Sequence, residues 1–426
     1  MTRKARMIAF WIAVILLPLV LLFVANISHG PKKIERPIEM AYSVSDSQFL
    51  RAMTALLGPP LVRGNRVQAL QNGDQIFPAM LAAIRSAQTS VTFETFIYWS
   101  GQVGGDFAEA LSERARAGVQ VHVILDALGI NRIDEDYIRR MEGAGVKLVR
   151  YRPVRWYTLG RLNNRTHRKI LVVDGRVAFT GGVGIADVWL GNADSPEHWR
   201  DSHFRIEGPV VGQMQAAFND NWTEAAGTVL HDERYFPPLD SSGPLVAQVF
   251  ISSNDGGPEL TRMMYLMSIA GARQRIQIAN AYFVPDDMAR DMLVQARQRG
   301  VEIDIIVPGP ITDAVVTRRS SRSRWGPLLQ AGVRIHEYQP TMFHSKVMVV
   351  DGRWVSVGST NFDNRSFRLN DELNLNVCDS AFAADLSRAF EDDLRRARPI
   401  TFEAWRRRPF GEKLKEKLAG LLRSQL

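Results

Sequence analysis

The sequence has 426 residues but a single cysteine, Cys378. An internal disulfide is therefore impossible, and zinc sites built on cysteine pairs are excluded. The chain also lacks a His-Glu-x-x-His motif and has no cluster of carboxylates that would suggest a catalytic metal. We expect no metal and no other cofactor, so any catalysis must use the side chains of the protein itself.

The central part of the chain has no excess of positive charge. The formal net charge is +8, but residues 1–36 and residues 405–426 each contribute +5, which leaves about −2 for the segment between them. A nucleic-acid enzyme is expected to spread basic side chains over its binding face. The distribution therefore argues against a nucleic-acid partner and concentrates basic charge at the two ends of the chain.

One long apolar run is present, from Met7 to Ile27. Its length is about that needed to cross a bilayer, and Arg3, Lys4 and Arg6 precede it. A cleaved signal peptide would have a shorter apolar region and a small-x-small cleavage site, and no clean site follows this run. We therefore expect an uncleaved, single-pass membrane anchor. Basic residues flank both of its ends, so the charges do not select an orientation.

The most informative feature is one motif that occurs twice. Each copy has the spacing His-x-Lys-x-x-x-x-Asp, an apolar filling and an Asp-Gly turn, and small residues follow each copy. The residues of the two motifs are His167, Lys169, Asp174, His344, Lys346 and Asp351. A single copy would be a weak signal, but two matching copies in one chain are a strong one.

The segments around the motifs repeat as well. Residues 118–125 resemble residues 300–307, and residues 143–151 resemble residues 330–338. Each half reads as strand, helix, strand, helix and strand, which predicts parallel strands with helices on both faces. The expected fold class is therefore α/β, duplicated.

We expect five parts along the chain. They are a membrane anchor at residues 1–30, a linker and lead-in helix at 31–60, a first half at 61–240, a second half at 241–400 and a basic amphipathic tail at 401–426.

The alternation of side chains along a strand predicts how each motif is used. In the first motif, His167 and Lys169 project from the same face, whereas Asp174 falls at the turn and on the opposite parity. Asp174 is therefore expected to position the chain or to pair with a cation rather than to touch a substrate. The same argument applies to the second motif and to Asp351.

One histidine and one lysine from each half supply what a metal-free reaction at a phosphodiester requires. One neutral imidazole would attack phosphorus and form a phosphohistidine. The other, held protonated, would release the first alcohol and later deprotonate the incoming hydroxyl. Lys169 and Lys346 would place positive charge on the phosphate oxygens, and Asn361 and Ser359 would add hydrogen bonds.

With these motifs the chain resembles the phospholipase D superfamily and, within it, the bacterial cardiolipin synthases. The further matching segments are Trp199–Asp201, Ala281–Asp286, Asn361–Ser366, Asn370–Asn374 and the tail from Trp405 to Pro409. The likeness covers residues 65–426.

The resemblance implies a bilobal fold in which two sheets abut, with the active site in the seam. It implies that His167 is the attacking residue and that His344 serves as acid and base. It also implies a carboxylate behind each imidazole, contributed by the other half. The candidates by position are Glu372 behind His167 and Asp201 behind His344.

The resemblance further implies a phosphatidyltransferase of the bacterial inner membrane that joins two phosphatidylglycerols into cardiolipin and releases glycerol. Phosphatidylglycerol and other anionic phospholipids are then the expected partners. Hydrolysis of phospholipids to phosphatidic acid is the alternative, because the motif does not decide whether water or an alcohol takes up the intermediate. A nucleic-acid phosphodiesterase is a weaker alternative because of the charge distribution.

The chain departs from the family pattern at one position. Gly184 stands where the family has Asn after the first motif, whereas Asn361 keeps the pattern after the second. Loss of one hydrogen-bond donor to the phosphate could lower the rate by about 10²–10³. A protein that binds lipid without turnover is therefore the non-enzymatic alternative.

Two basic segments have two interpretations each. Residues 318–325 would either contact a lipid headgroup or be a solvated run. A helix in the tail would carry Phe410, Leu414, Leu418, Leu421 and Leu422 on one face, with lysines elsewhere. This pattern fits an interfacial helix on anionic lipid, and it fits equally a helix packed on the protein with a solvated charged face.

Overall fold

The computed structural model describes residues 34–153, 163–253 and 259–423, together with Gln425 and part of the first seventeen residues. The chain forms two compact units, Met1–Ile34 and Glu35–Leu426. Most of the predicted anchor, Met7–Ile27, lies outside the described residues. Among the residues that are described, no helix combines the length and the apolar character that crossing a bilayer requires.

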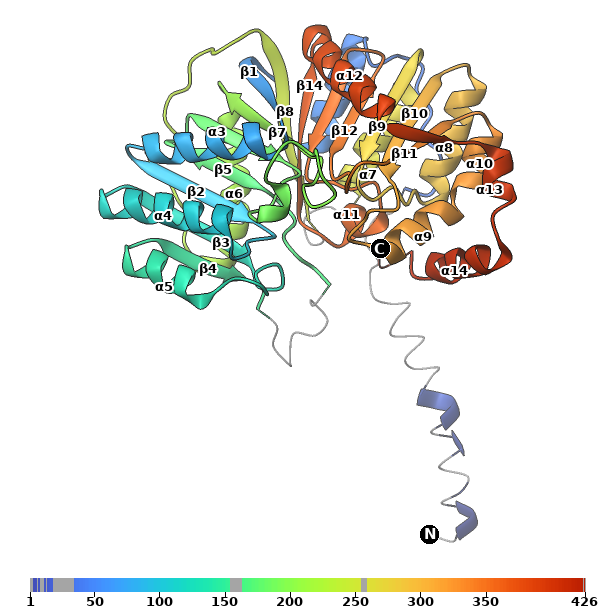
Figure 1. Ribbon diagram of the computed structural model, residues 1–426, viewed down its shortest axis with the longest axis horizontal. Coiled ribbons are helices and arrows are strands. Elements are labelled where there is room, and N and C mark those ends of the chain that lie inside the picture. Colours follow the sequence, from blue (N-terminus) through green and yellow to red (C-terminus); the bar gives the residue numbers. More distant parts are fainter. Residues whose placement is uncertain are drawn as a thin grey trace. The chain divides into compact units, whose positions relative to one another are not determined.

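All the named strands of the larger unit belong to one sheet of fifteen strands (Figure 1). The order is β15-β11-β10-β9-β12-β13-β14-β8-β1-β7-β6-β5-β2-β3-β4. The strands of the first half are β1 (Val62–Gln71), β2 (Ser90–Thr95), β3 (Gln120–Asp126), β4 (Lys147–Tyr151), β5 (Ile170–Val173), β6 (Val177–Gly181) and β7 (Ser202–Glu207). Those of the second half are β8 (Leu245–Ser252), β9 (Arg275–Asn280), β10 (Glu302–Pro308), β11 (Arg334–Tyr338), β12 (Lys346–Val350), β13 (Trp354–Gly358), β14 (Glu372–Cys378) and β15 (Ala397–Ile400).

The expectation of two abutting sheets is wrong, because the sheet is continuous. Strand β1 pairs antiparallel with β7 on one edge and with β8 on the other. An unpaired edge strand exposes a row of N–H and C=O groups, and this pairing satisfies both edges at the junction. The sheet is mixed: β2-β3-β4 and β9-β10-β11 are parallel, and the other pairs are antiparallel.

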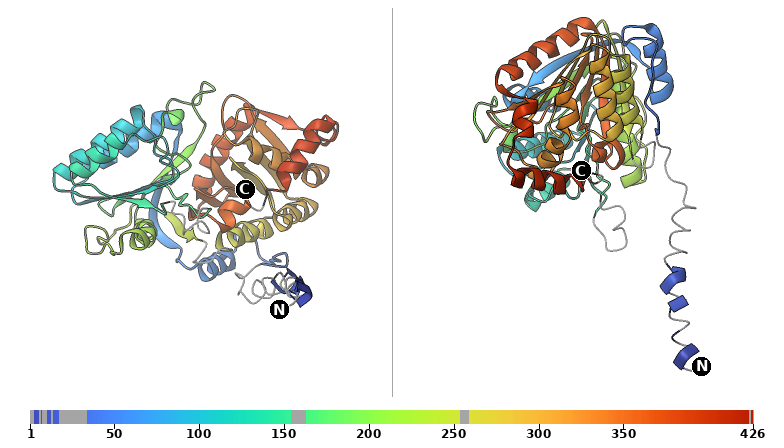
Figure 2. Two further views of the ribbon diagram at one scale, coloured as in Figure 1. Left: turned by 90° about the horizontal axis from the view of Figure 1, so that it is seen from below. Right: turned by 90° about the vertical axis from the view of Figure 1, so that its right-hand side faces the viewer.

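Helices cover both faces of the sheet (Figure 2). Along β5 the alternate side chains Leu171 and Val173 face the core under α3, α4 and α5, whereas Ile170 and Val172 face the core that contains α6. That second core continues across the junction to α12 in the second half.

The helices of the larger unit are α2 (Ser47–Leu57), α3 (Asn72–Ser86), α4 (Gln102–Arg116), α5 (Glu135–Gly143), the short 3₁₀ helix η2 (Asp187–Trp189), α6 (Val211–Ala226), α7 (Leu260–Gly271), α8 (Asp287–Gln298), α9 (Val315–Ser323), α10 (Trp325–Gln330), α11 (Asn364–Arg368), α12 (Ser380–Arg395), α13 (Phe402–Arg406) and α14 (Phe410–Gly420). The predicted division between residues 240 and 241 falls in the connection between α6 and β8, and it stays a prediction.

The two halves also exchange short backbone contacts beside the motifs. His167 N donates to Asp371 O at 2.8 Å, and Asp371 N donates to Arg165 O at 2.9 Å. In the reciprocal contact, Arg200 N donates to Met342 O at 2.9 Å and His344 N donates to Arg200 O at 2.7 Å. The backbone of each motif histidine is therefore held by the opposite half.

A buried ion pair reinforces the second contact. The guanidinium of Arg200 donates from Nε and Nη2 to the two carboxylate oxygens of Asp393 in α12, both at 2.8 Å. Both side chains are almost completely buried. Removing one partner of a buried pair leaves an uncompensated charge, which is strongly destabilising.

We expect Asp393→Ala to lower the free energy of unfolding by about 3–5 kcal/mol, because it strands the buried Arg200 guanidinium. The matched control is Asp392→Ala, which removes a neighbouring carboxylate whose pair with Arg395 is exposed and contributes little. Urea unfolding of the full chain measures both variants. Equal unfolding midpoints for the two variants would contradict the assignment of this ion pair.

Candidate active site

Each motif begins just before a central strand, and its histidine and lysine lie together. Lys169 Nζ donates to the backbone oxygen of His167 at 2.7 Å, and Lys346 Nζ donates to that of His344 at 2.5 Å. The same local contact therefore folds both lysine side chains back toward their own histidines. Lys169 and Lys346 are both buried.

The two motif aspartates lie at turns, away from the histidines. Asp174 and Gly175 both have positive φ, as a type I′ turn requires, and so do Asp351 and Gly352. The Asp174 carboxylate accepts hydrogen bonds from the backbone N–H groups of residues 88–90, and the Asp351 carboxylate accepts from those of residues 273–275. Each carboxylate thus fixes the start of the neighbouring strand, β2 or β9.

One pocket of about 210 Å³ receives both imidazoles. Its lining includes His167 and Lys169 from the first half and His344 and Asn361 from the second. Lys346 lies beside it, with Nζ 3.1 Å from His344 Nε2. Two histidines that are far apart in the sequence therefore face one small cavity, together with the positive charge of both lysines.

His167 hydrogen-bonds through Nδ1 to the carboxylate of Glu372, with both oxygens at 3.0 Å. Glu372 is fully buried and also accepts from the hydroxyls of Ser359 at 2.5 Å and Ser366 at 2.7 Å. Although burial alone would raise its pKa, His167 and these hydrogen bonds lower it, so the carboxylate stays ionised. An ionised acceptor at Nδ1 keeps the proton there and leaves the Nε2 lone pair free.

His344 has the equivalent arrangement with Asp201 of the first half. Its Nδ1 lies 2.7 Å from Asp201 Oδ2, which also accepts from Trp189 Nε1 at 3.0 Å. Asp201 Oδ1 accepts from the Ser202 backbone N–H at 2.8 Å. Burial raises the Asp201 pKa, but His344 and its hydrogen bond outweigh that effect and lower it. Glu372 and Asp201 thus lie where the family resemblance implied, each across the junction from its histidine.

The pKa shifts of the motif residues come mainly from burial. Burial lowers the pKa of His167 to about 4, although Glu372 opposes the shift. The pKa of Lys169 falls to about 7 and that of Lys346 to about 8 for the same reason. Burial and the Lys346 ammonium also lower the pKa of His344. This downward shift of the His344 pKa is opposite in direction to the one expected for an imidazole that its surroundings hold protonated.

Ser359 and Asn361 differ in what they contact. The hydroxyl of Ser359 donates to Glu372 and accepts from the Leu373 backbone N–H at 3.0 Å, so it supports the carboxylate and does not line the pocket. Asn361 does line the pocket, and its Oδ1 is buried without a hydrogen-bond partner. Of the two, Asn361 is the residue placed to hydrogen-bond a ligand.

Gly184 occupies the same place relative to His167 as Asn361 does relative to His344. A Cβ at Gly184 would lie 2.8 Å from Ile97 Cβ and 3.2 Å from the indole of Trp189. Trp189 in turn occupies the place of Ser366 in the second half, and both donate a hydrogen bond to the carboxylate of their own half. The Trp189 side chain therefore fills the space that an asparagine at position 184 would need.

Sequence reasoning missed several residues of the pocket. Tyr282 donates to Asp313 at 2.6 Å, and both line the pocket on the His344 side. Phe96 lies on the other side, with its ring 5.7 Å from that of His167. Tyr282 was within a segment that carried the family resemblance, but no spacing pattern marks Phe96 or Asp313. Within the described residues, no group of three or more His, Cys, Asp or Glu side chains is arranged to hold a metal ion.

The basic segment at residues 318–325 lies in the second half of helix α9 and at the start of α10. Arg318 and Arg322 pair with Glu337, and Arg324 pairs with Asp287. Three of its arginines are therefore ion-paired with acidic side chains of the protein.

We expect Gly184→Asn to lower the free energy of unfolding by about 1–3 kcal/mol and to leave the activity no higher, because the new side chain overpacks against Ile97 and Trp189. The matched control is Gly212→Asn, since Gly212 has open space around its Cβ position. Urea unfolding and an activity assay compare the two variants. A faster and equally stable Gly184→Asn protein would contradict this packing argument.

Comparison with known proteins gives consistent results. A family model described as "Cardiolipin synthase, PLD-like domain" matches residues 80–222 and 265–394, which is more than half of the chain. Cardiolipin synthase 1 of Bacillus anthracis is 30% identical over 92% of this chain and 78% of its own length. Cardiolipin synthase A of Pseudomonas putida is 34% identical over 86% of this chain and 77% of its own.

Among solved structures, phosphatidylserine synthase of Haemophilus influenzae matches with a TM-score of 0.68 at 14% sequence identity, over 89% of this chain and 100% of that one. This likeness shows the fold alone. The duplicated α/β fold, the paired motifs and the matches in sequence lead to one conclusion: the chain belongs to the cardiolipin synthase family of phospholipase D-like proteins.

Proposed function

We propose that this protein is a phosphatidyltransferase that makes cardiolipin from two molecules of phosphatidylglycerol and releases glycerol. The observation that supports this most directly is the shared pocket, in which two imidazoles from different halves face one cavity with two lysines beside them. The curated relatives named cardiolipin synthase support the substrate class. Association with a bacterial inner membrane, with residues 7–27 as the anchor, is part of the same proposal.

In the first step, Nε2 of His167 attacks phosphorus, and a P–N bond forms as the P–O bond to the leaving glycerol breaks. The low pKa of His167 keeps this nitrogen unprotonated at neutral pH. His344 gives its proton to the leaving oxygen. Since its surroundings lower the His344 pKa, we propose that the phosphodiester anion, once bound beside it, raises that pKa and supplies the protonated acid.

In the second step, a hydroxyl of another phosphatidylglycerol attacks the phosphohistidine. His344, now neutral, accepts the proton of that hydroxyl, and the P–N bond to His167 breaks. Glu372 and Asp201 hold the two imidazoles through Nδ1 in both steps. Lys169 and Lys346 through their ammonium groups, and Asn361 through its Nδ2 amide, stabilise the charge that develops on the phosphate oxygens.

The first test is turnover. Full-length protein in phosphatidylglycerol vesicles should form cardiolipin and glycerol, and we expect His167→Ala and His344→Ala each to lose activity by more than about 10³-fold. His231→Ala, which changes an exposed histidine, is the matched control and should keep full activity. Phosphatidic acid as the sole lipid product would show that the protein is a hydrolase and not a transferase. Cardiolipin from either motif variant would refute the catalytic roles of His167 and His344.

The second test separates the two histidines. A phosphatidyl ester of p-nitrophenol has a leaving group that needs no general acid. We expect His344→Ala to release one equivalent of nitrophenol and to accumulate a phosphorylated protein, because His167 still attacks, whereas His167→Ala should release none. Mass spectrometry locates the adduct. An adduct on residue 344 in the His167→Ala protein would reverse the assignment.

The third test is the pH dependence of kcat/KM. Since the pKa of His167 is about 4, lowering the pH from 7 to about 5 leaves the nucleophile neutral and should not reduce kcat/KM. Raising the pH through about 7 and then 8 removes the charges of Lys169 and Lys346, so kcat/KM should fall on the alkaline side. A profile that falls on the acid side near pH 6.5, the usual imidazole pKa, would contradict the burial of His167.

A further inference from the structure

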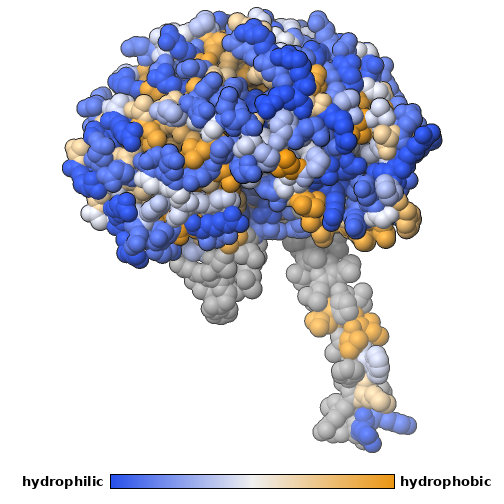
Figure 3. Space-filling model, in the orientation of Figure 1, coloured by the Kyte–Doolittle hydropathy of each residue, from blue (hydrophilic) through white to orange (hydrophobic). Residues whose placement is uncertain are grey.

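Helix α14 packs its polar side, and not its apolar side, against the rest of the protein. Its buried residues are Glu416 and Ala419, and it lies beside α9. With 3.6 residues per turn, the large apolar side chains fall on the side opposite Glu416. They are Phe410, Leu414 and Leu418 in the helix, which are 79%, 47% and 56% exposed, and Leu421 and Leu422 in the turn after it, which are 74% and 53% exposed. The helix therefore directs its apolar side chains outward, which is visible along the lower edge of the molecule in Figure 3.

Polar contacts fix this orientation. Glu416 is 3% exposed and accepts from Arg322 Nε at 2.9 Å and from Arg408 Nε at 2.5 Å. Beyond the helix end, Arg423 pairs with Asp287 at 3.2 Å. Turning the apolar residues inward would bury them only by breaking the ion pairs of Glu416. The outward apolar side is thus a stable feature of the fold.

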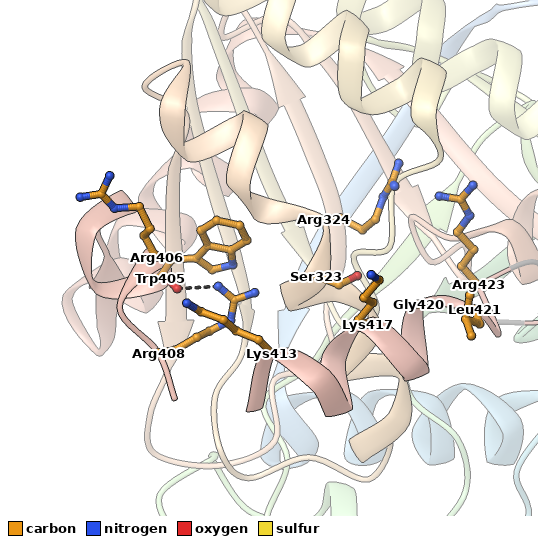
Figure 4. Close-up of a pocket in the computed structure, with 10 residues that line it drawn as sticks. All are labelled: Ser323, Arg324, Trp405, Arg406, Arg408, Lys413, Lys417, Gly420, Leu421 and Arg423. Carbon is orange, nitrogen blue, oxygen red and sulfur yellow. Dashed lines mark hydrogen bonds between the residues drawn. The ribbon is translucent and has the colours of Figure 1, made fainter. Parts of the chain in front are cut away.

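Basic residues border the apolar side. A cavity of about 740 Å³ beside α14 is lined by Arg324, Arg406, Arg408, Lys413, Lys417 and Arg423 (Figure 4). Among the described residues, no acidic side chain pairs with Lys413 or Lys417, and Lys415 lies on the other flank of the apolar side. Apolar side chains between flanking lysines are the arrangement of a helix that lies on an anionic lipid surface.

The same region borders the active-site pocket. Gln425, just after α14, lines that pocket, and its Oε1 accepts from Asn163 Nδ2 at 2.5 Å. At the N-terminal end of α9, Val315 and Val316 are 48% and 43% exposed, and the next residue, Thr317, lines the pocket. The segment that follows α14 and the start of α9 thus both adjoin the pocket.

We propose that the exposed apolar side chains of α14, together with Val315 and Val316, form a docking face for an anionic phospholipid bilayer. The apolar side chains enter the boundary between headgroups and acyl chains, and Lys413, Lys415 and Lys417 lie on the lipid phosphates. This holds the pocket at the bilayer surface, where a phospholipid headgroup can enter it. The proposal deepens the proposed function, since a lipid substrate needs such access, but docking itself requires no turnover.

The test uses a fluorescent probe at one position of the full chain. Cys378→Ser removes the only cysteine, and Leu418→Cys then carries an environment-sensitive fluorophore. The protein is reconstituted into vesicles of phosphatidylglycerol and phosphatidylcholine with brominated acyl chains, which quench fluorophores that contact them. The matched control is Arg388→Cys in α12, whose side chain is 73% exposed. Because quenching is local, attachment of the protein through any other segment gives no signal at residue 418.

We expect the probe at residue 418 to be quenched at least two-fold more than the probe at residue 388, and less in vesicles of phosphatidylcholine alone. Equal quenching at both positions would overturn the proposal. An unquenched probe at residue 418 in a protein that self-associates would also overturn it, because a second copy of the chain would then cover the docking face. Quenching in a protein that forms neither cardiolipin nor phosphatidic acid would refute the proposed function and leave the docking face standing.

A second variant tests the consequence for substrate. We expect Leu414→Glu/Leu418→Glu to raise the KM for phosphatidylglycerol in vesicles at least ten-fold more than the KM for a short-chain, dispersed phosphatidylglycerol. Val229→Glu is the control, because it adds the same charge at an apolar residue that is 59% exposed and distant in sequence. Equal effects on both forms of the substrate, or an equal effect of the control, would count against docking through α14.

Discussion

The site depends on each half holding the catalytic histidine of the other. Glu372 of the second half bonds His167, and Asp201 of the first half bonds His344. The backbone N–H groups of the two histidines also donate their hydrogen bonds to the opposite half. Neither half can orient its own imidazole alone, so any rearrangement at the junction would affect both steps of the reaction. The continuous sheet and the buried ion pair of Arg200 with Asp393 oppose movement of the two halves at the junction.

The duplication has not kept the two halves chemically equal. Glu372 receives hydroxyl donors from Ser359 and Ser366, whereas Asp201 receives the indole N–H of Trp189 and lies against Gly182. The same packing accounts for Gly184 in place of an asparagine. Both lysines contact the backbone oxygen of their own histidine, and Lys346 Nζ in addition lies 3.1 Å from Nε2 of the His344 ring. An asymmetric site suits the proposed reaction, because one imidazole must act as nucleophile and the other must carry protons.

Helix α14 shows that amphipathic pattern and burial are separate properties. The pattern in the tail was compatible with packing on the protein or with lying on a lipid surface, because both use one apolar side. The structure shows the charged side packed, through Glu416, and the apolar side exposed. Burial of the apolar side against the protein is therefore not what holds this helix. Gln425, in the segment after the helix, brings the tail to the rim of the active-site pocket.

The sequence by itself determined the duplication, the α/β class and the six motif residues, because spacing along a strand decides which side chains share a face. It also placed Asp174 and Asp351 at turns, since both precede a glycine. Only the tertiary structure decided the single continuous sheet, the support of Glu372 by Ser359, and the displacement of an asparagine at position 184 by Trp189. It also set the direction of the His344 pKa shift, which is downward and so opposite to the one expected. These features arise from contacts between residues far apart in the chain and from burial, and neither is encoded in local spacing.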